Sequence, residues 1–408
     1  MTKKIWEMSA LQAHELLKKK EISASEILES SIQRIEEVDG NLNALPERCF
    51  ARAREVANNI DKNSSSKFQP NLLGLPIAVK DYNDLSGVRT TYGSTIFKNN
   101  IPKASDRTIK LLERNGANPV AKSNVPEWAG GHTFNPVNGL TRNPWDISKS
   151  AGGSSGGSAS ALASGQVFLA TGNDLGGSLR TPAGFNGVVG LRPSPGLIPR
   201  GDRYMPFDTL WVEGPMARTV EDLALMLDSM VGHDIGDPLS FKSKTGCFIE
   251  SLKRDLKPIS IAVSEDLNLV PVDSEVRKVF KTAINNLSKH GLEINDDIPD
   301  FSGVLDAFKT LRGVLMATML GDLVKTHKDS ILEDIGELSL SGKKVAIFGL
   351  GDSSTYTENY CDAMEELHSY FIKAGAEMVG YVDKSSYTFD ESKSVIGESF
   401  CGLPLDED

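Results

Sequence analysis

Two clusters of glycine and serine, separated by a short apolar segment, place the strongest constraint on how this chain folds. Both lie within residues 149–182, KSAGGSSGGSASALASGQVFLATGNDLGGSLRTP. Glycine at this density lets a backbone adopt left-handed conformations and approach a ligand closely. A serine in such a backbone is a candidate nucleophile, and neighbouring N–H groups can turn toward an oxyanion. The apolar residues between the clusters argue against the alternative of a flexible linker.

The composition is that of an ordinary globular protein, with 39% hydrophobic and 24% charged residues over 408 positions. This length suggests two or three domains. A formal net charge of −11 argues against a nucleic-acid partner. The four cysteines lack CxxC spacing, which disfavours a metal site or a disulfide framework and suits a reducing compartment. No apolar run of about 18 residues is present, so we expect a cytoplasmic protein without a membrane partner.

Helices and short buried strands alternate along the chain. Ser9 and Ser23 each begin a capping box, and Gly40 is expected to end the second helix. Alternation of this kind predicts an α/β fold with a mixed or parallel sheet covered by helices. The expected strands are 74–81, 119–122, 167–170 and 259–263, and the later expected helices are 108–114, 220–230 and 276–287.

The reactive serine needs a base, and the sequence offers two candidates. His132 is the histidine nearest to the serine clusters, but a single histidine in this setting is more often structural. Lys80 ends an apolar strand, where burial would lower its pKa and let the amine accept a proton. A lysine after a strand is more often a solvated charge. Together with two glycine–serine loops, Lys80 becomes the better candidate.

Two other interpretations of the glycine-rich segment fail on local pattern. The sequence around Ser155 fits G-x-S-x-G, the nucleophile turn of α/β-hydrolases, but that turn should follow a buried strand and residues 143–149 do not form one. A phosphate-binding loop requires lysine after the glycines in G-x-x-x-x-G-K-[ST] order, and no lysine occupies that place.

Six motifs together resemble the amidase signature family of serine hydrolases, in its order and spacing over residues 5–328. Any one of them alone would be weak evidence. They are Lys80-Asp81, residues 141–146 (TRNPWD), residues 152–158 (GGSSGGS), residues 174–180 (DLGGSLR), residues 189–194 (VGLRPS) and residues 214–219 (GPMART). The resemblance implies an amidase fold and hydrolysis of a carboxamide C–N bond, without a cofactor or a metal.

The resemblance also implies a role for each matched residue. Ser178 would attack the amide carbonyl, Ser154 would relay the proton from a position typically held by a cis peptide bond, and neutral Lys80 would accept it. The oxyanion would be held by backbone N–H groups of four consecutive residues: Leu175, Gly176, Gly177 and Ser178. A covalent acyl-enzyme would form and then react with water.

Other residues of the same loops are expected to support the site without reacting. The resemblance assigns this role to Ser155, Asp174 and Arg180. Many family members carry Thr where this chain has Asn173, and we expect this change to tune the loop. The aromatic residues Trp128, Phe134 and Trp211 indicate either an apolar acyl pocket or ordinary core packing.

The C-terminal part departs from the family. The family's usual final strands are missing from this sequence, and residues 332–408 resemble the second half of a long-chain flavodoxin. The match includes residues 349–352, Tyr356, residues 359–364 and residues 400–408. It implies that Tyr356 stacks on the ring of FMN. The opposing interpretation is an exposed loop tyrosine, because no strand followed by a phosphate-binding loop is found.

The sequence thus predicts an amidase signature domain at residues 1–330 that lacks its usual C-terminal part, and a partial flavodoxin-like segment at residues 331–408. The main expected function is hydrolysis of a small-molecule amide, with homodimer formation left open. Two alternatives remain: an FMN-binding electron carrier, and an inactive protein whose shortened scaffold does not hold Lys80 and Ser178 in register.

Overall fold

The structure is a computed structural model, and it divides the chain into two compact units, Met1–Gly321 and Asp322–Asp408. It describes the first unit with four internal gaps and the second only in short stretches. The described residues are 4–63, 71–201, 205–243, 247–254, 259–327, 344–345, 348–351, 364–365, 368–369, 372, 377–387, 392–401 and 403–406.

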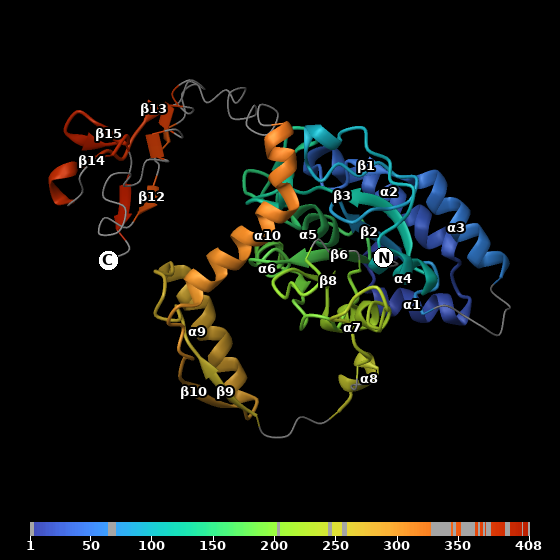
Figure 1. Ribbon diagram of the computed structural model, residues 1–408. Coiled ribbons are helices and arrows are strands. Elements are labelled where there is room, and N and C mark those ends of the chain that lie inside the picture. The colour runs from blue at the N-terminus through green and yellow to red at the C-terminus, as the bar shows by residue number, and fades with distance from the viewer. Residues whose placement is uncertain are drawn as a thin grey trace. The chain divides into compact units, whose positions relative to one another are not determined.

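A six-stranded mixed sheet forms the centre of the first unit (Figure 1). Its order is β1-β3-β2-β6-β8-β7, in which β2 pairs in parallel with β3 and β6 while the other pairs are antiparallel. The predicted mixed α/β fold is therefore confirmed. The strands are β1 Glu47–Arg48, β2 Pro76–Lys80, β3 Asn118–Ser123, β6 Leu169–Asp174, β7 Val189–Gly190 and β8 Val212–Ala217.

Helices cover both faces of this sheet, and side chains alternate along β2 accordingly. Ile77 and Val79 belong to one apolar cluster, which also includes residues of α1, α4 and α7. Ala78 belongs to the other cluster, with residues of α2, α3 and α5. The sheet is thus buried on both sides, as its apolar strands require. The helices are α1 Ala10–Lys19, α2 Ala24–Leu42, α3 Phe50–Lys62, α4 Arg107–Arg114, α5 Gly156–Ala163, α6 Arg180–Asn186 and α7 Val220–Asp228.

The first two helices begin where their capping boxes predict. Ser9 and Ser23 each accept a hydrogen bond from the N–H group three residues later. The predicted end of α2 at Gly40 is wrong, because the helix continues to Leu42. Asn43 is its C-cap, with a left-handed φ of 52°. Asparagine tolerates this conformation better than other residues with a side chain. In addition, its amide donates to the carbonyl of Asn138 at 2.6 Å.

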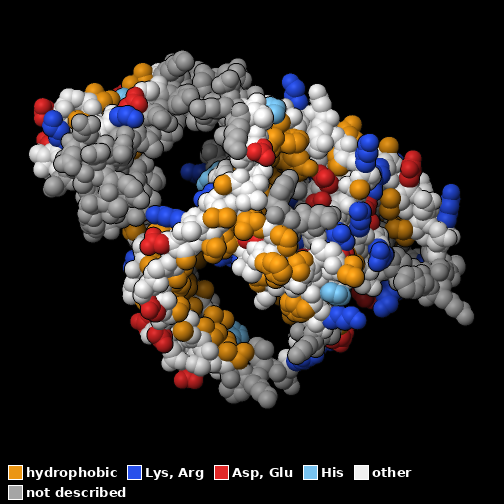
Figure 2. All heavy atoms as spheres, viewed as in Figure 1, with side chains coloured by type: hydrophobic (Ala, Val, Ile, Leu, Met, Phe, Trp, Pro, Cys, Tyr) orange, Lys and Arg blue, Asp and Glu red, His pale blue; other side chains and the backbone are white. Residues whose placement is uncertain are grey.

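The C-terminal part of the first unit carries a second, smaller α/β arrangement. The strands β9 (Ser260–Val263) and β10 (Glu293–Asp296) pair in parallel, and α9 (Ser274–Lys289) joins them. The predicted strand and helix here are confirmed, whereas α10 (Val304–Thr326) was not predicted. The α9 helix has no buried residue, and Val276 and Val279 are exposed. Figure 2 shows hydrophobic side chains on the surface over this helix.

The second unit contains small sheets. Its strand β12 (Phe348–Gly351) pairs in parallel with β17 (Leu403–Asp406), and β11 (Lys344–Val345) with β13 (Glu377–Met378). The remaining strands form an antiparallel sheet: β14 Val382–Asp383, β15 Val395–Ile396 and β16 Ser399–Phe400. Tyr356 lies outside the described residues, as does most of the helix expected at residues 362–372.

Candidate active site

The candidate residues meet at the carboxyl ends of β2 and β6, which lie side by side and run in the same direction. Lys80 is the last residue of β2, and Ser178 follows the end of β6 by four residues. Ser154 comes from the loop that leads into α5. This short helix was not predicted, since it begins with glycine. Gly157 is required there, because a Cβ would collide with the backbone of Asn124.

The Lys80 side chain is fully buried and makes two short hydrogen bonds. Its Nζ lies 2.8 Å from Ser154 Oγ and 2.6 Å from Asn173 Oδ1. The Gly153–Ser154 peptide bond is cis. Both partners of the amine are neutral, so no carboxylate is in direct contact with Lys80. The lysine and the first serine cluster, 74 residues apart in the sequence, are thus brought into hydrogen-bond contact.

Burial sets the protonation of this amine. Desolvation lowers the pKa of Lys80 to about 7, although the carboxylates of Glu213 and Asp174 act in the opposite direction. Removing the ammonium from water without a direct counter-ion disfavours its charged form. A substantial neutral fraction of Lys80 is therefore present near neutral pH, and a neutral amine can accept a proton.

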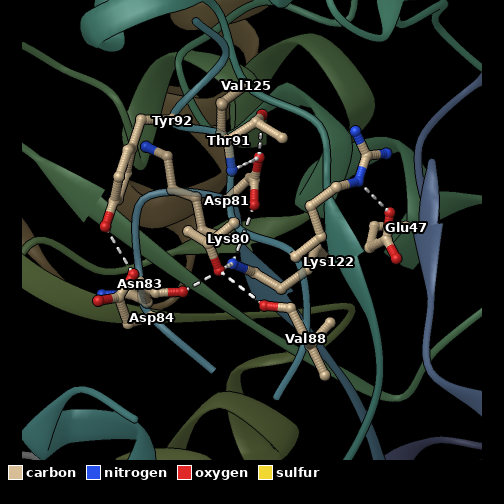
Figure 3. Close-up of polar contacts among 12 residues, drawn as sticks. Glu47, Lys80, Asp81, Asn83, Asp84, Val88, Thr91, Tyr92, Lys122 and Val125 are labelled. Carbon is tan, nitrogen blue, oxygen red and sulfur yellow. Dashed lines mark hydrogen bonds and ion pairs between the residues drawn. The ribbon is translucent and has the colours of Figure 1, made fainter. Parts of the chain in front are cut away.

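A second buried lysine nearby has different partners. Lys122 Nζ lies 2.9 Å from Asp81 Oδ1 and donates to the carbonyl of Asn83 and to Thr90 Oγ1, both at 2.7 Å (Figure 3). The other carboxylate oxygen of Asp81 accepts from the Thr91 N–H and hydroxyl. This ion pair holds together the segments after β2. Sequence reasoning missed it, because lysine at the end of β3 carries no distinctive signal.

Asp174 organises the loop that carries Ser178. Its carboxylate accepts from the N–H groups of Gly177 and Leu179 and from the guanidinium groups of Arg180 and Arg192. Burial alone would raise the pKa of Asp174, but the hydrogen bonds from Arg180, Gly177 and Leu179 outweigh it and lower the value to about 2. The loop therefore closes on a permanent carboxylate, and both Asp174 and Arg180 hold it in shape.

The backbone N–H groups of this loop fall into two sets. The Gly177 N–H donates to Asp174 Oδ1 at 2.9 Å and is thus engaged. The N–H groups of Leu175, Gly176 and Ser178 donate to no residue that the structure describes. Three positions of this loop thus keep donors available near the Ser178 side chain. The Ser155 N–H donates to the Ser178 carbonyl at 3.3 Å, which joins the two loops, while the buried Ser155 hydroxyl has no partner among the described residues.

Ser178 lines a cavity of about 300 Å³. Aromatic and apolar side chains form much of the wall, and Trp128 and Trp211 are among them, whereas Phe134 is not. The Ser178 hydroxyl makes no hydrogen bond to Ser154 or to another residue within the described ranges. A larger hollow of about 780 Å³ contains none of the candidate residues. The complete lining is Trp128, Ala129, Gly131, His132, Gly153, Asn173, Leu175, Gly176, Ser178, Thr181, Trp211, Phe308, Arg312 and Met316.

The alternative base and the alternative nucleophile have other surroundings. His132 lines the cavity, but its Nδ1 pairs with Ser150 Oγ and not with Ser154 or Ser178. Ser155 is fully buried at the start of α5 and is not part of the cavity wall. Among the described residues, no group of three or more His, Cys, Asp or Glu side chains could hold a metal ion. No described helix is long and apolar enough to cross a membrane.

Comparison with known proteins agrees with this geometry. The model of the family described as Amidase matches residues 26–349. The chain belongs to the amidase family. This match begins within α2 and extends past residue 328, where the sequence resemblance was expected to end. Lys80, Ser154 and Ser178 all lie inside it.

Among curated proteins, the chain is similar to one component of glutamyl-tRNA(Gln) amidotransferase, the component designated GatA. It is 36% identical to this component of Persephonella marina over 71% of this chain and 60% of the relative. It is 33% identical to that of Caldanaerobacter subterraneus subsp. tengcongensis over 80% of this chain and 69% of the relative. The chain thus spans about 60% of the length of the Persephonella marina relative that it matches.

Solved amidases have the same fold. A bacterial aryl acylamidase of the amidase signature enzymes superposes with a TM-score of 0.73 at 29% identity, covering 78% of this chain and 68% of the other. A 6-aminohexanoate cyclic dimer hydrolase solved with its substrate gives a TM-score of 0.71 at 28% identity, covering 79% and 67%. The mixed sheet covered by helices is thus the amidase signature architecture.

Proposed function

We propose that this protein hydrolyses the C–N bond of a small carboxamide through Ser178, Ser154 and Lys80. The observation that carries the proposal is the buried Lys80 amine, 2.8 Å from Ser154 Oγ, at the same sheet edge as Ser178 in its cavity. A lysine that is partly neutral near pH 7 can act as a general base without a histidine.

In the proposed mechanism, Ser178 Oγ attacks the carbonyl carbon of the bound amide. Its proton passes to Ser154, whose own proton moves to the neutral amine of Lys80. The N–H groups of Leu175, Gly176 and Ser178 stabilise the oxyanion, while that of Gly177 stays with Asp174. Lys80 then returns the proton through Ser154 to the leaving nitrogen, and the C–N bond breaks. Water attacks the resulting ester by the same proton path and releases the acid.

The cavity supports a substrate with an apolar or aromatic acyl group. Trp128, Trp211 and Phe308 contribute aromatic surface, and Arg312 places a cation at the wall. This lining suits a small molecule, as in the aryl acylamidase and the cyclic dimer hydrolase. The curated relatives are components of an amidotransferase, so a role within a larger assembly is a second candidate alongside a homodimer.

A fluorophosphonate probe tests the nucleophile. We expect the purified chain to be labelled on Ser178, with the site located by peptide mapping, and we expect Ser178→Ala to abolish labelling. The exposed Ser148, which only caps a turn through Asp146, gives a matched control in Ser148→Ala with unchanged labelling. Labelling that persists in Ser178→Ala, or that maps to Ser155, would show that the assignment is incorrect. A wild-type chain that is not labelled would favour the inactive alternative.

The flavodoxin-like electron carrier is the competing proposal. The described part of the second unit supports it with the parallel pair β12 and β17, at the end of which the glycine-rich segment starts. Those same residues include no loop leading into a helix that could hold the FMN phosphate, and Tyr356 lies outside them. The described residues therefore do not fit FMN, and the proposed amide chemistry uses only side chains, backbone N–H groups and water.

A further inference from the structure

Asn173 is a polar residue that the mechanism above does not use, although it touches the base. It belongs to β6, is only 3% exposed and lines the cavity beside Ser178. Its Oδ1 accepts a hydrogen bond from Lys80 at 2.6 Å. Its Nδ2 is buried and donates to no residue that the structure describes. A buried donor without an acceptor typically costs about 1–3 kcal/mol, so its presence in a cavity wall points to an acceptor on a ligand.

The contact at Oδ1 fixes how the Lys80 amine is oriented. A neutral amine has two N–H bonds and one lone pair, and its neighbours here are Asn173 Oδ1 and Ser154 Oγ. An amide oxygen can only accept. One N–H of Lys80 must therefore face Asn173, which leaves the lone pair free to face Ser154. Asn173 is thus a positioning residue for the proton path.

The neutrality of asparagine matters at this position. The charged groups around the amine are Glu213, which pairs across β8 with Asn173, and Asp174, which follows it; Arg200 in turn lies 3.7 Å from Glu213. Neither carboxylate is in hydrogen-bond contact with Lys80. A carboxylate in place of the Asn173 amide would stand 2.6 Å from the amine and would hold it as an ammonium ion.

We propose that Asn173 orients the Lys80 amine through Oδ1 and donates from Nδ2 to an acceptor oxygen of the bound substrate. This oxygen is distinct from the scissile carbonyl, whose charge is stabilised by the loop N–H groups. The preferred substrate class is therefore a carboxamide that carries a second carbonyl or hydroxyl oxygen. The substrate half of the inference rests on the proposed amidase function, and the Lys80 half does not.

The Lys80 half is tested by titrating the full chain with ¹³Cε-labelled lysine in NMR, with Lys80→Met to assign the signal. We expect Asn173→Asp to raise the measured pKa of Lys80 by about 1 or more, because an adjacent carboxylate favours the ammonium form. Asn173→Leu removes an acceptor and lowers that pKa, while Asn173→Thr keeps an acceptor and restores the wild-type titration. Circular dichroism checks the fold of each variant. An unchanged Lys80 pKa in both Asp and Leu variants would overturn the positioning role.

The substrate half is tested with a matched pair, 4-oxopentanamide and pentanamide. We expect the wild type to favour the oxo compound in kcat/KM by about three- to tenfold, the range of one neutral hydrogen bond. The ratio falls to about 1 in Asn173→Leu and below 1 in Asn173→Asp; effects on Lys80 cancel within each ratio. An equal ratio in wild type and variants would overturn the donor role. A wild type that cleaves neither amide would overturn the proposed function, while the Lys80 titration would still decide the positioning role.

Discussion

At the scale of single residues, two buried lysines show how neighbours assign a role. Lys122 and Lys80 are both fully buried, on paired strands. Lys122 contacts the carboxylate of Asp81 and is a structural cation. Lys80 contacts only neutral oxygen atoms, and burial lowers its pKa to about 7. This difference in partners makes Lys80 the proposed base and Lys122 part of the scaffold.

The pKa of Lys80 gives a pH dependence with a defined sign. The base must be neutral, so the rate of Ser178 labelling by a fluorophosphonate should be low in acid. It should rise as pH passes through about 7 and level off above this value. Lys80→Met should reduce the rate by about 10²- to 10⁴-fold and remove this rise. A wild-type rate that does not change between about pH 5 and 9 would exclude Lys80 as the titrating group.

At the scale of elements, the proposed chemistry depends on where strands end. The parallel strands β2 and β6 bring Lys80 and the Ser178 loop to one edge of the sheet. The ion pair between Lys122 and Asp81 joins the end of β3 to the segment after β2, and Asp174 closes the loop after β6. These buried contacts hold the candidate residues in place, because every neighbouring strand is buried on both faces.

The Lys122 ion pair should be essential for stability. Lys122→Met leaves the buried carboxylate of Asp81 without its counter-ion, which typically destabilises a protein by about 3–5 kcal/mol. The free energy of unfolding, measured by denaturant titration, should fall by this amount. The matched control is the exposed pair of Arg54 with Glu29, where Arg54→Met should cost less than about 1 kcal/mol. Equal effects of the two substitutions would contradict this interpretation of the buried pair.

At the scale of the whole molecule, all candidate residues for the amide chemistry belong to the first of two compact units. Lys80, Ser154, Asn173 and Ser178 lie within Met1–Gly321, and the flavodoxin-like resemblance concerns the second unit. The smaller arrangement of β9, α9 and β10 exposes apolar side chains within the first unit. The proposed proton path involves no described residue of the second unit.

The amide chemistry should therefore be independent of flavin. We expect the rate of Ser178 labelling in the full chain to be the same with and without added FMN, measured alongside a visible absorbance scan of the purified protein. The Ser178→Ala variant serves as the blank. A labelling rate that changes with FMN, or flavin absorbance that remains with the protein, would support a functional second unit.

The fold class, most strands and helices of the first unit and the candidate reactive groups could be predicted from the sequence, because local periodicity and the spacing of Gly, Ser and Lys are properties of the chain. The prediction failed at Gly40, since the cap of α2 depends on contacts of Asn43 with distant residues. It also missed the ion pair of Lys122, the engagement of the Gly177 N–H and the contact of Asn173 with Lys80. These features required the folded structure, since burial and hydrogen-bond partners arise when strands distant in sequence come together.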